Sequence, residues 1–243
     1  IEGTKKKLKE LIYKYNVDVI SLGNGTASRE SEEVIAEMIS EIKEETGKEI
    51  AYVIVSEAGA SVYSASELAT KEYPDLDVTV RGAISIGRRL QDPLAELVKI
   101  DPKAIGVGQY QHDVTPKKLE ESLAGVVEDS VNTVGVDLNI ATPSLLTHIS
   151  GINAAIAKNI VDYREEAGHF TSRKELLKVK RLGQKAYEQC AGFLRVAESK
   201  EPLDNTSVHP ESYDAAKKLI GVLGYDNEAL KNNKLGDICL LYT

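Results

Sequence analysis

Two stretches of similar pattern decide the fold of the second half of the chain: LLTHISGIN at residues 145–153 and LLKVKRLG at residues 176–183. Each has a pair of leucines, a short turn around a small residue, and then a sequence typical of a helix. A lead-in, DLNIAT at residues 137–142, precedes the first stretch. The two stretches begin about thirty residues apart, which indicates an internal duplication within residues 137–196.

Both turns have the features of a phosphate-binding site. Gly151 and Gly183 give the backbone freedom at a tight turn, and Ile152 and Leu182 can pack against the helices behind it. Because a helix begins at each turn, its first N–H groups have no partner within the helix, and the helix dipole adds partial positive charge. Such a turn can bind a phosphate oxygen without contacting a base. The alternative is a plain helix–turn–helix connection.

The same segment is a basic island in an acidic chain. Residues 151–195 contain nine Lys or Arg and five Asp or Glu, a net charge of +4, whereas the whole chain carries −8. Such a local excess of positive charge indicates a surface for a polyanion. We expect Lys158, Lys180, Arg181 and Lys185 to act through contact with phosphates.

Residues 137–196 resemble the tandem helix-hairpin-helix domains of proteins such as the competence DNA receptor ComEA, in which a similar Asn-x-Ala-Thr lead-in precedes the first hairpin. The resemblance implies binding to the nucleic-acid backbone without sequence preference. The residues it implies are Gly151, Ile152 and Asn153 in the first hairpin and Arg181, Leu182 and Gly183 in the second. The family hairpin is usually Gly-apolar-Gly, so each hairpin here lacks one glycine. Because Asn tolerates the left-handed backbone region, we expect the first hairpin to be the stronger phosphate site.

The composition is that of an ordinary globular protein. With 243 residues, 42% hydrophobic and 28% charged, the chain can form one large or two small domains. No apolar run approaches the roughly 20 residues of a membrane span. Cys190 and Cys239 form no metal-binding pattern, so we expect no disulfide framework, no metal site, no cofactor and a cytoplasmic location. The chain begins at Ile1, which we interpret as the start of a fragment.

The first part of the chain alternates strands and helices. Residues 17–22 and 50–55 are apolar and predict two strands. The helix predicted between them, from Ser28 to Gly47, favours a parallel pair because such strands need a long crossover. Two strands do not make a stable sheet, so we expect either that further strands lie outside this chain or that a partner supplies them.

Three further segments have few sequence features that indicate a function. Residues 81–136 predict helices that connect the two regions, and we interpret Arg88 and Arg89 as part of an exposed helix face. Residues 197–208 are polar and predict a linker before a C-terminal helical segment. The apolar residues 238–243 carry no prediction.

Two acidic residues raise the alternative of an enzyme. Glu57 follows the second predicted strand, and Asp92 lies in a later helical stretch. Acids at strand ends can hold Mg²⁺ for phosphodiester hydrolysis, but both residues also have the positions of helix-capping acids. Two acids fall short of a two-metal site, so we expect no catalysis. The turn GNGTASRE at residues 23–30 either cradles a phosphate or is a plain capped turn.

Four longer strings resemble the Tex family of bacterial transcription-accessory proteins. They read GNGTASRE (residues 23–30), SEAGASVYS (56–64), RRLQDPL (88–94) and GVGQYQHDV (106–114), and together with the tandem hairpins they extend the resemblance over about residues 10–220. It implies a YqgF-like domain of the RNase H-like fold, followed by a helix-hairpin-helix domain. Within it, Glu57 matches the second acidic position of active relatives, and Asp92 the third. The strand that carries the first catalytic Asp and the C-terminal S1 domain of the family have no match here.

The sequence therefore predicts an α/β part, the C-terminal portion of a YqgF domain of the RNase H-like fold, followed by a mostly helical region. The expected domains are residues 1–80, 81–136, 137–196 and 197–243. The expected function is non-catalytic, sequence-independent binding of single-stranded RNA or DNA, or of a duplex, in a transcription-accessory protein that also meets the transcription machinery. A Mg²⁺-dependent nuclease using Glu57 and Asp92, and a protein-interaction scaffold, are the alternatives.

Overall fold

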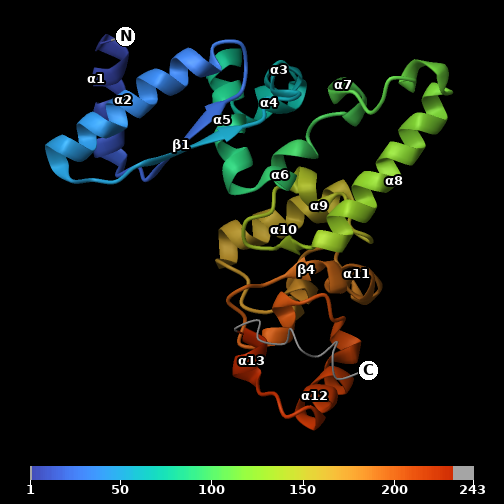
Figure 1. The fold of residues 1–243 in the computed structure, drawn as a ribbon. Helices are drawn as coiled ribbons and strands as arrows, with labels where there is room; N and C mark the ends of the chain where they lie inside the picture. Colours follow the sequence, from blue (N-terminus) through green and yellow to red (C-terminus); the bar gives the residue numbers. More distant parts are fainter. Residues whose placement is uncertain (1, 232–243) are drawn as a thin grey trace. The chain divides into compact units, whose positions relative to one another are not determined.

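The computed structural model describes residues 2–231 (Figure 1). Contacts divide the chain into two compact units, Ile1–Asp113 and Val114–Thr243, and each is described by itself. The uninterpreted segment 238–243 and Cys239 lie outside the described residues. Among the helices of residues 2–231, none combines the length and the apolar composition needed to cross a membrane.

The first unit is built around a parallel pair of strands, as predicted. β1 (Val19–Gly23) and β2 (Ala51–Val55) pair in register from Val19 opposite Ala51 to Gly23 opposite Val55. The crossover is α2 (Ser28–Thr46), which ends where Gly47 adopts a left-handed φ of 70° and donates its N–H to the Lys43 carbonyl. A glycine is suited to that position because it has no Cβ to clash with the backbone.

The apolar core of the first unit lies between α1, α2 and the strands. α1 (Glu2–Tyr15) packs against α2, and Ile12, Met38, Ile42 and Ile50 form a buried cluster between these elements. The remaining helices of the unit are α3 (Ala60–Ser64), α4 (Glu67–Glu72), α5 (Val78–Gln91), α6 (Pro93–Leu97) and α7 (Pro102–Ile105).

Helix α5 lies on the sheet, although residues from 81 onward were predicted to form a helical connector. It contacts both strands and α3, and the Ser21 hydroxyl of β1 donates to the Ile86 carbonyl at 3.1 Å. Its buried positions are Arg81, Ser85 and Arg89, one helical turn apart. The interpretation of Arg89 as exposed is wrong: only 5% of this residue is accessible. A buried face made of polar residues gives no hydrophobic periodicity, which is why the sequence did not reveal it.

Two buried charges of this unit, Glu96 and Lys99, pair with each other. Glu96 accepts a hydrogen bond from the Ser85 hydroxyl at 2.9 Å and lies 2.8 Å from the Lys99 ammonium. Lys99 also lies 3.0 Å from Glu72 and 5.2 Å from the centre of the Tyr63 ring. Such partners are needed because an isolated charge in a protein interior is strongly unfavourable.

The second unit contains the duplicated segment. It begins with α8 (Pro116–Val134), and its next elements are β3 (Val136–Asp137), α9 (Pro143–Leu146), α10 (Ala154–Ala167), η2 (Arg173–Lys178), α11 (Gln184–Cys190), η3 (Ala191–Phe193) and β4 (Leu194–Arg195). β3 and β4 form a short parallel pair, with Val136 opposite Leu194. This pair joins the beginning and the end of the duplication, so that the two halves form one packed domain.

The lead-in residues 137–142 are hydrogen-bonded to the rest of this domain. The Asn139 side chain accepts a hydrogen bond from the Phe170 N–H at 2.7 Å and donates to the Phe170 carbonyl at 3.0 Å. Arg164 donates to the Leu138 carbonyl at 2.8 Å and to the Ala141 carbonyl at 3.1 Å. The lead-in motif therefore holds the loop between the two halves through hydrogen bonds to its backbone.

Residues 197–208 are packed, which corrects their interpretation as a linker. They include η4 (Pro202–Asn205), and η5 (Pro210–Ser212), α12 (Tyr213–Val222) and α13 (Asn227–Lys231) follow. The fully buried Arg173 donates to the Leu194 and Val208 carbonyls, both at 2.7 Å, and to the Thr206 carbonyl. Asp204 accepts hydrogen bonds from the Arg173 N–H at 3.0 Å and from the Tyr213 hydroxyl at 2.6 Å. Within this segment, Asp204 makes these internal bonds through its side chain, and Thr206 and Val208 make them through their backbone carbonyls.

Candidate nucleic-acid interface

The first hairpin has a left-handed residue, a buried residue and a capping residue in succession. Gly151 has a φ of +81°. Ile152 is buried, and its N–H donates to the Ile149 carbonyl at 3.0 Å. Asn153 is the N-cap of α10: its φ is −95°, and its side-chain oxygen accepts the Ile156 N–H at 3.0 Å. Gly151 and Asn153 are exposed, so the turn faces solvent while Ile152 anchors it.

The second hairpin repeats this backbone geometry with other residue types. Arg181 has a φ of +67°. Leu182 is buried, and its N–H donates to the Val179 carbonyl at 3.2 Å. Gly183 is the N-cap of α11, with an extended backbone and no side-chain capping bond. The duplication inferred from the sequence is therefore present as a repeated turn geometry.

The structure corrects the expected roles of Asn153 and Gly183. Asn153 is not left-handed; Gly151 is, and Arg181 is its counterpart. Asn153 and Gly183 are both N-caps, but only Asn153 covers an N–H of its helix. The first turn of α11 therefore keeps more uncapped N–H groups than that of α10. The reason given for the first hairpin, a left-handed Asn153, is absent from the structure, and which hairpin binds phosphate more strongly stays a prediction.

The cations expected at the interface are free to meet a ligand. Lys158, Lys180, Arg181 and Lys185 are exposed, and within residues 2–231 none of them belongs to an ion pair. Other members of the basic island point inward. Burial lowers the pKa of Arg195 to about 10, and this side chain donates to the Gly192 carbonyl at 2.7 Å. The charge offered to solvent is thus smaller than the sequence count of nine basic residues.

The first hairpin lies directly on the helix of the second. A Cβ atom added to Gly151 would lie 2.7 Å from the Cβ of Gln189 and 3.3 Å from the Ala186 carbonyl oxygen, both on α11. Real Cβ atoms essentially never approach a neighbour closer than 3.0 Å. A residue with a side chain at position 151 would therefore separate the two halves of the domain.

Glu57 and Asp92 both make capping contacts. The Glu57 carboxylate accepts the Gly25 N–H at 2.9 Å, and the Asp92 carboxylate accepts the Ala95 N–H at 3.0 Å. Among the described residues, no group of three or more His, Cys, Asp or Glu is arranged to hold a metal ion. A Cβ at Gly23 would lie 2.0 Å from the Glu57 carboxylate, so this carboxylate already fills the turn at residues 23–30 that was considered for a phosphate.

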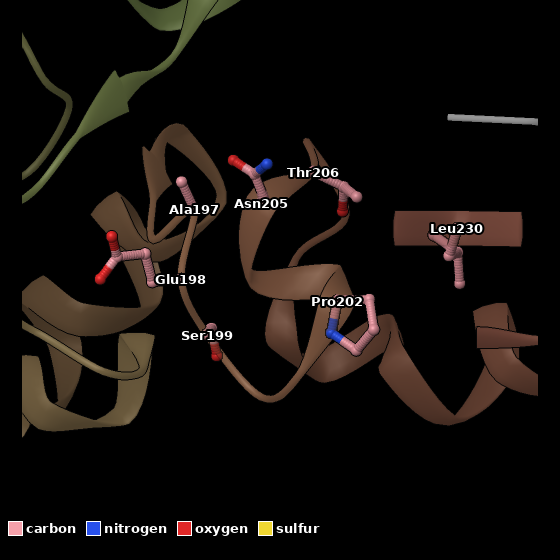
Figure 2. A pocket seen from close by; sticks show the side chains of 7 residues that line it. All are labelled: Ala197, Glu198, Ser199, Pro202, Asn205, Thr206 and Leu230. Atoms are coloured by element: carbon pink, nitrogen blue, oxygen red, sulfur yellow. The ribbon is translucent and has the colours of Figure 1, made fainter. Parts of the chain in front are cut away.

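A cavity of about 530 Å³ opens in the second unit, away from the two hairpins in sequence. Figure 2 shows the side chains that line it: Ala197, Glu198, Ser199, Pro202, Asn205, Thr206 and Leu230. These lining residues include a carboxylate and no basic side chain. The cavity is therefore poorly suited to phosphate, and the hairpins remain the better candidate interface.

Comparisons with known proteins agree with this arrangement. Three family profiles match: "Tex protein YqgF-like domain" over residues 1–91, "Helix-hairpin-helix motif" over residues 131–195 and "HHH domain" over residues 201–238. The first match ends where α5 ends, and the second contains both hairpins. The third match covers the segment that packs on Arg173.

Curated relatives are similar along almost the whole chain. Uncharacterized protein YdcI of Bacillus subtilis is 55% identical over 96% of this chain, and the transcriptional accessory protein Tex of Neisseria gonorrhoeae is 56% identical over 93%. The human S1 RNA-binding domain-containing protein 1 is 42% identical over 90%. The chain spans 32%, 30% and 27% of the length of these three proteins. The resemblance seen in the sequence is confirmed: the chain is homologous to the part of Tex transcriptional accessory proteins that carries a YqgF-like domain followed by helix-hairpin-helix domains.

Proposed function

We propose that the second unit binds nucleic acid through backbone phosphates, without reading the base sequence. The site is the hairpin face, which we define as both hairpins (residues 151–153 and 181–183) with Lys158, Lys180 and Lys185. The observation that carries the proposal is the repeated turn geometry, with a helix beginning at each turn and unpaired cations beside it. Phosphate contacts fix the position of a ligand without carrying sequence information.

The chemistry of the hairpin face favours phosphate over bases. The apolar residues of the hairpins, Ile152 and Leu182, are buried and cannot stack on a base. The exposed side chains of Lys158, Lys180, Arg181 and Lys185 are all cationic donors. Single-stranded RNA or DNA, or a duplex, presents the phosphate acceptors that these donors need. A transcription-accessory role in the cytoplasm, in contact with the transcription machinery, is the setting we propose.

Salt-dependent binding tests the proposal. Fluorescence anisotropy with labelled single-stranded and duplex DNA and RNA measures the affinity over a salt series, and each phosphate contact on duplex DNA contributes about −0.9 to the log–log slope. The variant Lys180→Glu/Arg181→Glu/Lys185→Glu is expected to flatten the slope. A matched control, Lys6→Glu/Lys14→Glu/Lys118→Glu, changes the net charge equally at exposed positions elsewhere. If wild type does not bind at low salt, or if both variants weaken binding equally, the hairpin face is not the site.

We propose no catalytic role for Glu57 and Asp92. In support, both carboxylates cap backbone N–H groups. A nuclease assay with Mg²⁺ tests this: cleavage by the wild-type chain that Glu57→Gln abolishes would establish the nuclease alternative. Salt-insensitive binding to a protein, with no affinity for nucleic acid, would instead favour a scaffold role.

A further inference from the structure

One hydrogen bond links the helix of the first hairpin to the turn of the second. Asn159 lies on α10, and its side-chain Nδ2 donates to the Lys180 carbonyl at 2.7 Å. The two residues are 21 positions apart in sequence. Asn159 is half-buried, whereas Lys180 is exposed. Nothing in the sequence pattern marked Asn159, because a single asparagine within a helix has many roles.

This bond acts on the strained residue of the second hairpin. The Lys180 carbonyl belongs to the peptide group that precedes Arg181, and rotating that group changes the φ angle of Arg181. Arg181 has a φ of +67°, a left-handed angle that is unfavourable for a residue with a side chain. A donor fixed to the Lys180 carbonyl opposes the return of Arg181 to an ordinary backbone angle.

Two contacts link the hairpins to each other's helices. The first hairpin rests through Gly151 on Gln189 of α11, the helix that begins at the second hairpin. The second hairpin is held through Lys180 by Asn159 of α10, the helix that begins at the first. Each hairpin is thus positioned by the helix of the other.

We propose that Asn159 is a positioning residue for nucleic-acid binding: it holds the Lys180–Arg181 peptide so that both hairpins can meet one phosphate backbone together. This inference rests on the proposed function of the hairpin face. Two contacts on one ligand reinforce each other only when their geometry allows both to form, because the second contact is then intramolecular. Asn159 acts through the backbone of Lys180 and not through a phosphate contact of its own.

Binding by Asn159→Ala is the first part of the test. Loss of the hydrogen bond is expected to weaken binding about 3- to 10-fold and to reduce the salt slope, since fewer phosphates are contacted at once. The control is Asn205→Ala, an exposed asparagine on η4 in the same unit. Wild-type affinity and slope in Asn159→Ala, or an equal loss in Asn205→Ala, would overturn the inference.

A double-mutant cycle separates positioning from direct contact. Combined with Lys180→Ala/Arg181→Ala, Asn159→Ala is expected to add little further loss, because the cationic side chains that it positions are already gone. Combined with Lys158→Ala on α10, its effect is expected to be additive. Additive losses in both combinations would show that Asn159 contacts the ligand by itself, and the positioning role would be rejected.

Amide hydrogen exchange gives a readout that needs no ligand. In Asn159→Ala, the N–H group of Leu182, which donates to the Val179 carbonyl, is expected to exchange faster, while those of α10 keep their wild-type rates. Unchanged exchange at the second hairpin would refute the inference even if binding were weakened. If the wild-type chain binds no nucleic acid, the proposed function fails, and the exchange result alone then decides whether Asn159 holds the turn.

Discussion

Replacing Gly151 with alanine should destabilise the second unit far more than replacing Gly183, although both glycines lie in a hairpin turn. At φ +81°, any side chain on residue 151 carries a backbone cost of about 1–2 kcal/mol. The added Cβ would also lie 2.7 Å from the Cβ of Gln189, which cannot swing away because it is bonded to the backbone of α11. Overpacking of this kind costs about 1–3 kcal/mol. The two costs together predict a loss of about 2–5 kcal/mol in the free energy of unfolding.

Gly183→Ala is the matched control. Gly183 has a φ of −84°, and a Cβ at this position would meet nothing within 4 Å. Alanine is a poorer N-cap than glycine, but it reduces the conformational freedom of the unfolded chain. These opposing effects predict a free energy of unfolding within about 1 kcal/mol of wild type.

Urea denaturation followed by circular dichroism measures both variants, and amide exchange of α10 assigns the transition to the second unit. The expected order is wild type and Gly183→Ala close together, with Gly151→Ala well below them. If Gly151→Ala is as stable as Gly183→Ala, then Gly151 does not pack on α11 as described, and the repeated turn geometry is wrong at the first hairpin.

Two further predictions concern buried groups. Arg173→Leu should lower the free energy of unfolding of the second unit by about 3 kcal/mol or more, because three backbone carbonyls lose their donor. Urea denaturation measures this loss. As a control, Lys174→Leu at an exposed position should stay within about 0.5 kcal/mol of wild type. Burial raises the pKa of the Cys190 thiol from 9.0 to about 12. The folded state then holds its proton more tightly than the unfolded state, so stability should fall as pH rises from about 9 towards 12. In a Cys239→Ser background, Cys190→Ala should lose less stability over this range, and an equal loss in both proteins would contradict the assignment.

The sequence predicted those features that depend on local pattern. The parallel strand pair follows from two apolar stretches and a crossover helix that ends at Gly47, and the structure contains this arrangement. The tandem hairpins follow from a repeated apolar–turn–helix pattern, and both turns are present. In these cases, a single residue type or a short periodicity determines the backbone.

Features that depend on buried polar side chains could not be predicted from local sequence pattern. Arg89 was interpreted as exposed, but it donates to the Ser56 and Ala58 carbonyls at 2.7 and 2.8 Å. Residues 197–208 were interpreted as a linker because they are polar, but they pack around Arg173. A polar side chain is read as solvent-facing unless its partner is known, and these partners lie far away in sequence.

The two hairpins carry their single glycine at different positions of the turn. Each has one glycine where the family usually has two, which predicts weaker phosphate binding by either hairpin than the family implies. In the structure, the glycine of the first hairpin occupies the left-handed position that packs on α11, and Asn153 caps the next helix. In the second hairpin the glycine is at the cap, which leaves the start of α11 open, and the left-handed position places Arg181 at the exposed turn. We therefore infer a division of roles, in which the first hairpin fixes the packing of the domain and the second offers most of the phosphate donors.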